Sequence, residues 1–412
     1  MKKLILKPLK FLLYTVIALL ISVNLFIVLS GRFYIYKGFV NTYLVGKTGP
    51  GIYDKDIFAF STLKSPKEKS NVEYSSDFNT YKLSSADRKI IEDLETRAFL
   101  VYKGNELVYE EYWDDHDDQT VSNSFSVAKS IVSLLIGIAV EEGYIKSLDE
   151  PVSKYVKEFK SKNRQKITIR DLLTMSSGLD WTESGKNPLS DNAESYYGSD
   201  LRRLVTSQNL ISQPGKVFKY QSGNSQLLGF VLESATGKDF SKYAEEKLWK
   251  KLGMEHDGYW SLDKENGDEK AFCCMYAVAR DYGRIGQLFL NNGKFGETQV
   301  VPESYFKEMN TLADLSTEDG IPNYRYGLHT WYYKDGDNVV NYCRGVAGQY
   351  IIALPKEDLL IIRLGKKRAP DVKMDDYKSN PNKYNIYKIG HPSDLFDYLR
   401  IGKAIKLKSE KK

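Results

Sequence analysis

A serine and a lysine three residues apart, Ser126 and Lys129, are the side chains of this chain best suited to covalent chemistry. Side chains at positions i and i+3 of a helix share one face, so the Lys129 amine is expected beside the Ser126 hydroxyl. Serine is a weak nucleophile until a neighbouring base removes its proton. Desolvation disfavours the charged form of a buried lysine, so Lys129 can be neutral and accept that proton. The pair therefore predicts nucleophilic catalysis through an acyl-enzyme.

The sequence that follows Ser126 predicts a helix buried on every side. Within residues 127–140, apolar side chains occur nearly all the way round a 3.6-residue period. We expect Ser122 and Ser124 to cap this helix and Gly143 to end it. Backbone N–H groups at a helix start favour a developing negative charge, which makes the amide of Ser126 a candidate oxyanion donor.

The Ser-x-x-Lys spacing alone is a weak indication, because it occurs five times, starting at Ser61, Ser126, Ser261, Ser304 and Ser409. Only the copy at Ser126 starts a predicted buried helix, where an unpaired lysine is costly unless it has a task. An accidental buried lysine is the alternative interpretation. Perturbed ionisable groups cluster at functional sites, so we favour chemistry at Ser126.

Two further motifs follow along the chain. Tyr220 begins the segment Tyr-Gln-Ser-Gly, in which Ser222 is the third residue, and a tyrosine near a lysine can relay a proton to a leaving group. Gly345 and Val346 precede a predicted strand, where a glycine lets a backbone amide approach a substrate oxygen closely. The alternatives are an aromatic residue at a loop–helix junction and an ordinary glycine-containing turn.

Taken in order, the three motifs resemble those of the serine β-lactamase and D,D-peptidase superfamily, in particular its class C-like branch and the 6-aminohexanoate-dimer hydrolase group. The resemblance covers roughly residues 85–405, including residues 125–130 and 169–179. It implies an α+β fold of the β-lactamase/transpeptidase type, with an antiparallel sheet flanked by helices and a helical subdomain. It also implies a role for each residue of the motifs: Ser126 as nucleophile, Lys129 as base, Tyr220 as proton shuttle, the amides of Ser126 and Val346 as oxyanion donors, and Gly345 and Ser222 beside the substrate.

The chain departs from the family pattern at two positions. The third motif, often Lys-Thr-Gly or His-x-Gly, is here Cys343-Arg344-Gly345, with no cation in the first place. Since side chains alternate along a strand, we expect Arg344 to point to the opposite face. Ser222 replaces the commoner asparagine. We therefore expect neutral esters or linear amides to be cleaved better than penicillins or cephalosporins.

Residues 11–31 carry no charge and are long enough to cross a bilayer core of ~30 Å. Lys2, Lys3, Lys7 and Lys10 precede this segment, which predicts an N-terminus on the cytoplasmic side. We predict a single-pass anchor in the inner or cytoplasmic membrane, with the catalytic domain periplasmic or at the cell surface. A cleaved signal peptide is the alternative.

The predicted organisation is an anchor or uncleaved signal (1–31), an irregular lead-in (32–84), a hydrolase domain (85–405) and a basic tail (406–412). Alternating or apolar runs predict strands at residues 98–102, 107–113, 327–333, 349–354 and 359–365. Helices are predicted at residues 169–174, 239–252, 276–290 and 393–405. Strands at both ends imply a sheet assembled from both ends of the chain, with a helical region between them.

Other chemistries are not indicated. The two termini contribute four positive charges each, so the net charge of +5 leaves the body at about −3, and no nucleic-acid partner is predicted. The four histidines lack ligand spacing, and no phosphate-binding glycine loop follows a strand, so we predict no metal and no cofactor. Three cysteines give no disulfide framework, although a disulfide between Cys343 and either Cys273 or Cys274 stays an open alternative.

Amidase, esterase and peptidase activities all remain open. The alternative function is a catalytically silent module that binds a cell-wall peptide.

Overall fold

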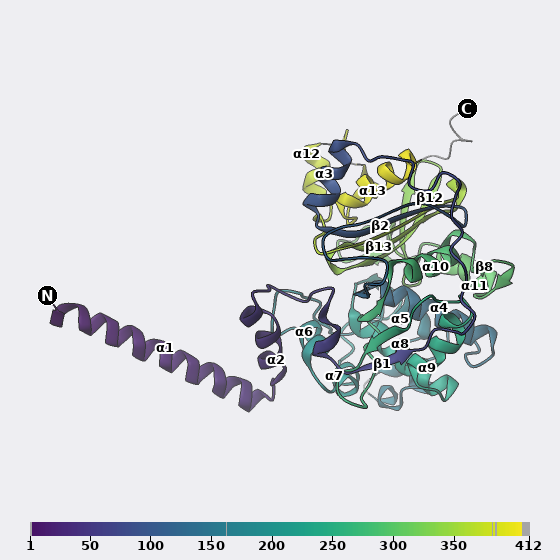
Figure 1. Cartoon of the computed structure of the whole chain (residues 1–412). Coiled ribbons are helices and arrows are strands. Elements are labelled where there is room, and N and C mark those ends of the chain that lie inside the picture. The colour runs from purple at the N-terminus through teal and green to yellow at the C-terminus, as the bar shows by residue number, and fades with distance from the viewer. Residues whose placement is uncertain (1, 162, 381, 384, 406–412) are drawn as a thin grey trace.

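The computed structural model describes residues 2–161, 163–380, 382–383 and 385–405, so the predicted basic tail lies outside the described residues. The body consists of a sheet layer with helices on both faces, stacked on a helical region (Figure 1). The long N-terminal helix α1 (Lys2–Ser30) projects away from the helical region. The stretch Pro8–Ser30 is long and apolar enough to cross a membrane, although a signal sequence has the same features.

The main sheet has six antiparallel strands in the order β11-β12-β13-β14-β2-β3. Strands β14 and β2 pair side by side and join the two ends of the chain, which confirms the predicted assembly. Strand β12 was not predicted, and β11 begins four residues later than expected. The strands are β2 (Thr96–Lys103), β3 (Glu106–Tyr112), β11 (Trp331–Asp335), β12 (Asn338–Gly345), β13 (Gln349–Leu354) and β14 (Leu359–Gly365).

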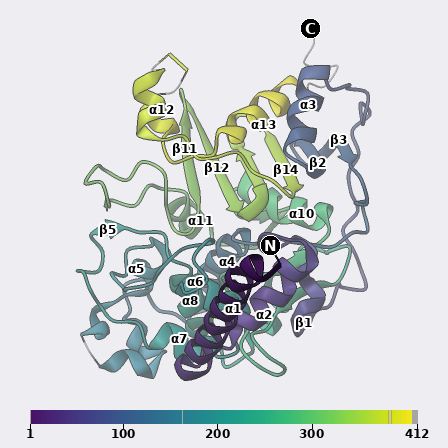
Figure 2. The same cartoon turned by 90° about the vertical axis from the view of Figure 1, so that its left-hand side faces the viewer.

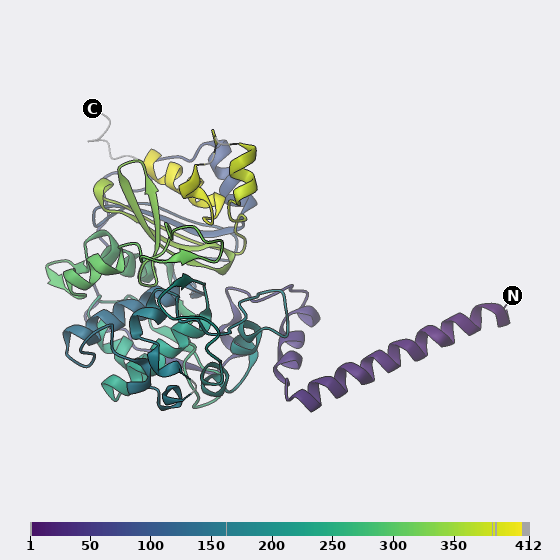
Figure 3. The ribbon, with the colours of Figure 1, turned by 180° about the vertical axis from the view of Figure 1, so that it is seen from behind.

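Helices cover both faces of this sheet because its strands are apolar on both sides. In β13, Tyr350 and Ile352 join the core beneath α13 (Ser393–Ala404), whereas Ile351 and Ala353 join the core shared with the helical region. Helix α3 (Ser85–Asp93) lies with α13 on the outer face, and α10 (Ala279–Leu290) lies on the inner face (Figures 1 and 3). The two-residue period of the strands thus builds two cores.

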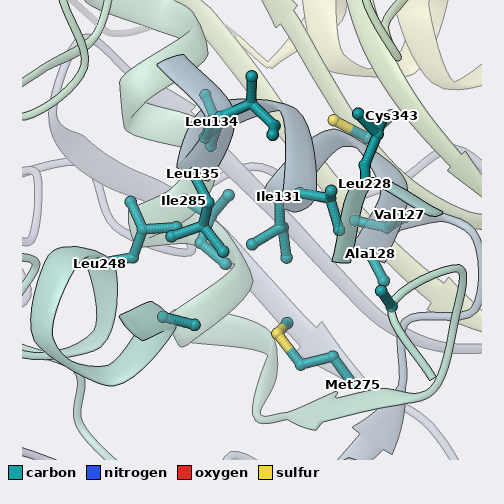
Figure 4. Close-up of a cluster of buried hydrophobic side chains, with 14 of the residues drawn as sticks. Val127, Ala128, Ile131, Leu134, Leu135, Leu228, Leu248, Met275, Ile285 and Cys343 are labelled. Carbon is teal, nitrogen blue, oxygen red and sulfur yellow. The ribbon is translucent and has the colours of Figure 1, made fainter. Parts of the chain in front are cut away.

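At the centre of the helical region lies α4 (Val127–Glu141), the predicted buried helix. Its side chains pack against residues from several other elements, as Figure 4 shows for Ile131 near Leu228 and for Leu135 near Ile285. Gly143, with φ +76°, follows the end of α4 as predicted. The predicted caps were wrong: Ser126 is the N-cap residue and its side chain makes no capping bond, while Ser122 lies in a short strand.

The remaining helices lie partly beside the main sheet and partly in the helical region around α4. Helix α8 (Ser222–Thr236) packs directly on it. The others are α2 (Tyr34–Asn41), α5 (Ile169–Leu173), α6 (Asp191–Tyr197), α7 (Leu201–Thr206), α9 (Phe240–Ala244), α11 (Glu303–Met309) and α12 (Met374–Ser379).

A second sheet, with the order β1-β6-β7-β4, corrects two predictions. The predicted helix over residues 276–290 begins only at Ala279, because β7 (Met275–Ala277) pairs with β6 (Gly258–Ser261) and β4 (Ser122–Asn123). The lead-in is not wholly irregular, since its β1 (Phe60–Leu63) pairs with β6. A short apolar run does not distinguish strand from helix, and the partner strands decided the outcome. Two small pairs complete the set: β5 (Val217–Phe218) with β10 (Ser316–Thr317), and β8 (Lys294–Phe295) with β9 (Thr298–Gln299).

Candidate active site

The structure brings Ser126 and Lys129 together at the start of α4. Phe125 adopts a left-handed backbone conformation (φ +45°), which turns the chain from β4 into the helix. Ser126 follows as the N-cap residue, and Lys129 lies one turn further on. Lys129 Nζ is 3.1 Å from Ser126 Oγ, and the lysine is only 1% exposed. A buried amine within hydrogen-bond reach of a serine hydroxyl is the arrangement that activates a nucleophile.

A backbone carbonyl holds the lysine from the other side. Lys129 Nζ donates to the carbonyl oxygen of Phe272 at 2.7 Å. Among the residues that the structure describes, no carboxylate lies within 4.0 Å of Lys129 Nζ. The amine is therefore positioned by two uncharged oxygens, from Ser126 and Phe272.

The loop that supplies this carbonyl contains a disulfide between the adjacent residues Cys273 and Cys274. Cys274 has φ +67°, a left-handed conformation that costs a non-glycine residue about 1–2 kcal/mol. On the far side of the bridge, the Met275 carbonyl accepts a hydrogen bond from Ser124 N at 2.7 Å. The loop thus contacts α4 before and after the nucleophile. The bridge between neighbours was not predicted, and Cys343 is a free, buried thiol rather than the open pairing partner.

Tyr220 lies next to this pair from the helical region. Its ring stacks on Trp331 at 5.7 Å between centroids and meets the edge of Tyr326. Lys129 Nζ lies 5.2 Å from the centroid of the Tyr220 ring. The structure therefore gathers the three predicted catalytic residues in one place.

The end of β12 reaches the nucleophile through a glycine. A Cβ atom on Gly345 would lie 2.3 Å from the Ser124 carbonyl oxygen, so only glycine allows this close approach. Val346, the next residue, is 55% exposed and lines the same cleft as Ser126. The predicted oxyanion residues thus share one cavity.

The other two residues of the third motif lie on opposite faces of β12. Cys343 is buried beside α4 (Figure 4). Arg344 points to the opposite face, as predicted, where its guanidinium lies 3.7 Å from the Trp331 ring centroid. It also donates to Asp371 at 3.4 Å and to the Gly390 carbonyl at 3.3 Å. Strand alternation explains both positions.

The nucleophile opens into a cleft of about 840 Å³, a volume typical of small-molecule sites. Ser222 lines it together with Ser126 and Val346. Its walls come from residues far apart in the sequence, namely residues 46–53 of the lead-in, residues 183–185 and 192–197, and residues 366–368 after β14.

Glu183 is a residue of the cleft that the sequence did not reveal. Its carboxylate accepts hydrogen bonds from Ser222 N at 2.7 Å, Ser222 Oγ at 2.8 Å and Trp181 Nε1 at 2.7 Å. The Ser222 hydroxyl therefore uses its one proton in the hydrogen bond to Glu183. Because this carboxylate sits in a polar loop and reaches Ser222 only through the fold, no local pattern could have identified it.

Cations also line the cleft and were missed. Four cations are lining residues: Lys47, Lys366, Lys367 and Arg368. Of these, Lys47 pairs with Asp54 at 2.9 Å and Arg368 pairs with Asp371 at 2.5 Å. Lys366 Nζ lies 5.0 Å above the Tyr53 ring. They come from two separate segments, so only their meeting in the fold makes them a group. In the sequence, the adjacent lysines Lys366 and Lys367 were the signal that could have indicated this group of cations.

The histidines have structural surroundings. Burial lowers the pKa of His329 to about 3, and the ring lies between Ser225 Oγ and the Leu173 carbonyl. Burial also lowers the pKa of His116 to about 4, and its Nδ1 shares a hydrogen bond with the Tyr53 hydroxyl. Within the described residues, no group of three or more His, Cys, Asp or Glu side chains is arranged to hold a metal ion.

Comparison with known proteins identifies relatives of this arrangement. A 6-aminohexanoate-dimer hydrolase of Paenarthrobacter ureafaciens is 24% identical over 300 residues, which span 69% of this chain and 76% of that protein. The structure of a candidate 6-aminohexanoate-dimer hydrolase from Bacillus anthracis has a TM-score of 0.71 at 22% identity, over 86% of this chain and 93% of that one. A D-stereospecific amidohydrolase from Streptomyces has a TM-score of 0.55 at 18% identity, over 69% and 94% of the two chains.

These structural likenesses establish the β-lactamase/transpeptidase-like fold, with its antiparallel sheet and flanking helices. The Beta-lactamase family model matches residues 87–379, which include both Ser126 and the third motif. The chain therefore belongs to the beta-lactamase family, and the relatives named above are hydrolases by name.

Proposed function

We propose that this protein is a serine hydrolase that cleaves an amide or ester bond through an acyl-enzyme. The observation that carries the proposal is the 3.1 Å contact between Lys129 Nζ and Ser126 Oγ at the mouth of a cleft. The names of the relatives support the same reaction class, since one is a hydrolase of the 6-aminohexanoate dimer and another is an amidohydrolase.

In the proposed acylation, the Lys129 amine takes the Ser126 proton as Oγ attacks the substrate carbonyl carbon. The amides of Ser126 and Val346 hold the developing oxyanion. Tyr220 passes a proton to the leaving amine or alcohol, and the carbonyl–leaving-group bond breaks. In deacylation the same groups activate a water molecule, which releases the acid and restores the Ser126 hydroxyl.

The proposed location is a cytoplasmic membrane crossed once by α1, with residues 85–405 as an extracytoplasmic hydrolase domain. The charge-free span and the lysines before it support this topology. The full-length protein should fractionate with membranes and be digested by protease added outside the inner membrane. A soluble mature chain that begins near Gly31 would show instead that the segment is cleaved.

The competing function is a silent module that binds a cell-wall peptide. Covalent labelling with a fluorophosphonate separates the two functions, since only an active serine is labelled. We expect labelling of the natural protein and of Ser304→Ala, and none of Ser126→Ala. A natural protein that binds peptide but neither labels nor hydrolyses a p-nitrophenyl ester would contradict the proposal.

A further inference from the structure

An exposed apolar strip begins directly where the apolar helix α1 ends. Seven large apolar or aromatic side chains between residues 33 and 45 are each at least 38% exposed: Phe33, Tyr36, Phe39, Val40, Tyr43, Leu44 and Val45. They lie on α2 and on the short 3-10 helix Tyr43–Val45. Monomeric soluble proteins rarely leave so many neighbouring apolar side chains in water, so we expect a partner to cover this outer strip.

The opposite face of α2 is fixed to the body. Tyr34 is buried and its hydroxyl donates to the Pro188 carbonyl at 3.0 Å. A Cβ atom on Gly38 would lie 3.2 Å from the Tyr197 ring, so α2 packs closely on α6. Arg32 approaches Glu194 at 3.7 Å. These contacts bury the inner face of α2, and the outer strip remains exposed.

A contact back to α1 places the strip relative to the apolar span. The Tyr36 hydroxyl donates to Asn24 Oδ1 at 2.6 Å, and Asn24 lies inside the Pro8–Ser30 stretch. Gly31 (φ +68°) makes the turn between the two helices, and Arg32 N donates to the Ile27 carbonyl. If α1 is embedded in a bilayer, α2 must therefore lie at the level where the span leaves it. Tyrosine, phenylalanine and flanking cations are typical of that level.

The same geometry sets the position of the active-site cleft. Helix α6, on which α2 packs, contributes Asn192, Ala193, Tyr196 and Tyr197 to the cleft lining. The chain that leaves the strip continues directly into the cleft wall at residues 46–53. Packed helices lie about 8–10 Å apart, so the cleft is roughly one helix away from the strip. Figure 2, which looks from the side on which α1 projects, shows α1 and α2 on this face of the helical region.

We propose that residues 33–45 dock in the interfacial region of an anionic lipid bilayer and hold the cleft at its surface, so that the enzyme draws its ester or amide substrates from that surface. The inference rests on the proposed hydrolase function and on a retained α1. The charge of the cleft wall agrees with an anionic surface, since Lys366 and Lys367 are exposed beside it. A basic side chain near such a surface contributes about 1 kcal/mol of attraction.

The test uses the full-length protein in vesicles of phosphatidylcholine and phosphatidylglycerol. A polarity-sensitive fluorophore is attached to Phe39→Cys, or to Glu297→Cys as a control in the β8–β9 hairpin, which lies on the far side of the body from α1 (Figure 1). The natural cysteines are bridged or buried, so the introduced thiol is the one labelled. We expect blue-shifted emission and quenching by nitroxide-bearing lipid at position 39 and neither effect at position 297. Equal emission and quenching at the two positions would overturn the docking.

A second measurement tests whether docking serves catalysis. Phe39→Ser/Leu44→Ser should lower kcat/KM about tenfold for an amphiphilic ester embedded in the vesicles, because two apolar anchors are lost. The same variant should hydrolyse a soluble p-nitrophenyl ester at the natural rate, as should Ile211→Ser, which alters an exposed apolar residue outside the strip. Equal losses on both substrates would assign the strip a structural role and overturn the inference.

The outcomes also separate this inference from the two proposals on which it rests. An inactive soluble-ester assay with the natural protein would contradict the hydrolase function, while the fluorescence would still report docking. Cleavage of the chain near Gly31, detected as a shorter mature chain, would remove the anchor that places the strip at the bilayer and would overturn the inference, while the soluble-ester assay would still report the hydrolase function.

Discussion

The carbonyl oxygen of Phe272 lies 2.7 Å from Lys129 Nζ, closer than the 3.1 Å that separates Nζ from Ser126 Oγ. The base of the proposed mechanism is thus tethered by a backbone group 143 residues away in sequence. Phe272 directly precedes the Cys273–Cys274 bridge, and residues of this loop line the cleft. The loop is therefore part of the machinery that orients the amine.

Replacement of the nucleophile should abolish turnover. Ser126→Ala should lower kcat/KM for a p-nitrophenyl ester by at least about a thousandfold, because removing a serine nucleophile leaves only binding and oxyanion stabilisation. Circular dichroism should show an unchanged fold. Ser304→Ala, at another Ser-x-x-Lys copy, should behave as the natural protein. Retained activity in Ser126→Ala would remove the central claim.

Lys129 and Tyr220 should both support acylation, but to different extents. General acid–base groups contribute about 10²–10⁴ to the rate, and we place Lys129→Ala near the upper part of that range and Tyr220→Phe near the lower part. The reason is that Lys129 removes the proton from the nucleophile itself, whereas Tyr220 serves the leaving group. Rapid-quench measurement of acyl-enzyme formation compares the two variants. A larger loss in Tyr220→Phe would reverse the assigned roles.

The substrate preference should follow from the third motif. Cys343 is buried and uncharged, and the Arg344 guanidinium is already engaged by Trp331 and Asp371. A charge-assisted hydrogen bond is worth about 1.5–3 kcal/mol, or one to two decades in kcat/KM. We expect a neutral p-nitrophenyl ester to be cleaved better than nitrocefin. A clear preference for nitrocefin would assign the missing role to Arg344 or to the lysines of the cleft wall.

The Cys273–Cys274 bridge should matter for activity because it lies between two carbonyls that hold the catalytic helix. Reduction with dithiothreitol should lower kcat several-fold through loosening of Phe272 and Met275. The double variant Cys273→Ala/Cys274→Gly should be insensitive to the reductant. The matched variant Cys273→Ala/Cys274→Ala should be less stable by about 1 kcal/mol, because alanine resists the left-handed backbone at position 274. Thermal unfolding compares the two, and equal stabilities would contradict the prediction.

The folded protein should lose stability in acid because of His116, whose ring is hydrogen-bonded to the cleft residue Tyr53. Burial lowers the pKa of this ring to about 4 in the folded protein, whereas an unfolded histidine has a pKa near 6.5. The unfolded chain binds a proton first as the pH falls. The stabilisation is therefore complete above about pH 6.5 and is lost progressively toward pH 4, with a magnitude on the order of 2–3 kcal/mol. His116→Gln should be less stable at pH 7 and should show a shallower decline of Tm over this range. An identical decline would place the acid sensitivity elsewhere.

Some of these features follow from sequence because they are local. The Ser126–Lys129 pairing needs only helical geometry over one turn, and the burial of α4 follows from its apolar residues on all sides. The hairpin of β2 and β3 and the strands β13 and β14 were likewise visible as short apolar or alternating runs. Three motifs in the right order were enough to indicate the family.

Other features were decided by groups that meet only in the folded chain. A backbone carbonyl has no sequence signature, so the hydrogen bond from Lys129 to the Phe272 carbonyl could not be predicted. Glu183 reaches Ser222 across 39 residues, and β7 became a strand only because β4 and β6 offered hydrogen-bond partners. Sequence determined which residues could do chemistry, because reactivity and helical spacing are local. The tertiary structure decided what holds them in place, because tethers and cleft walls are contacts between distant segments.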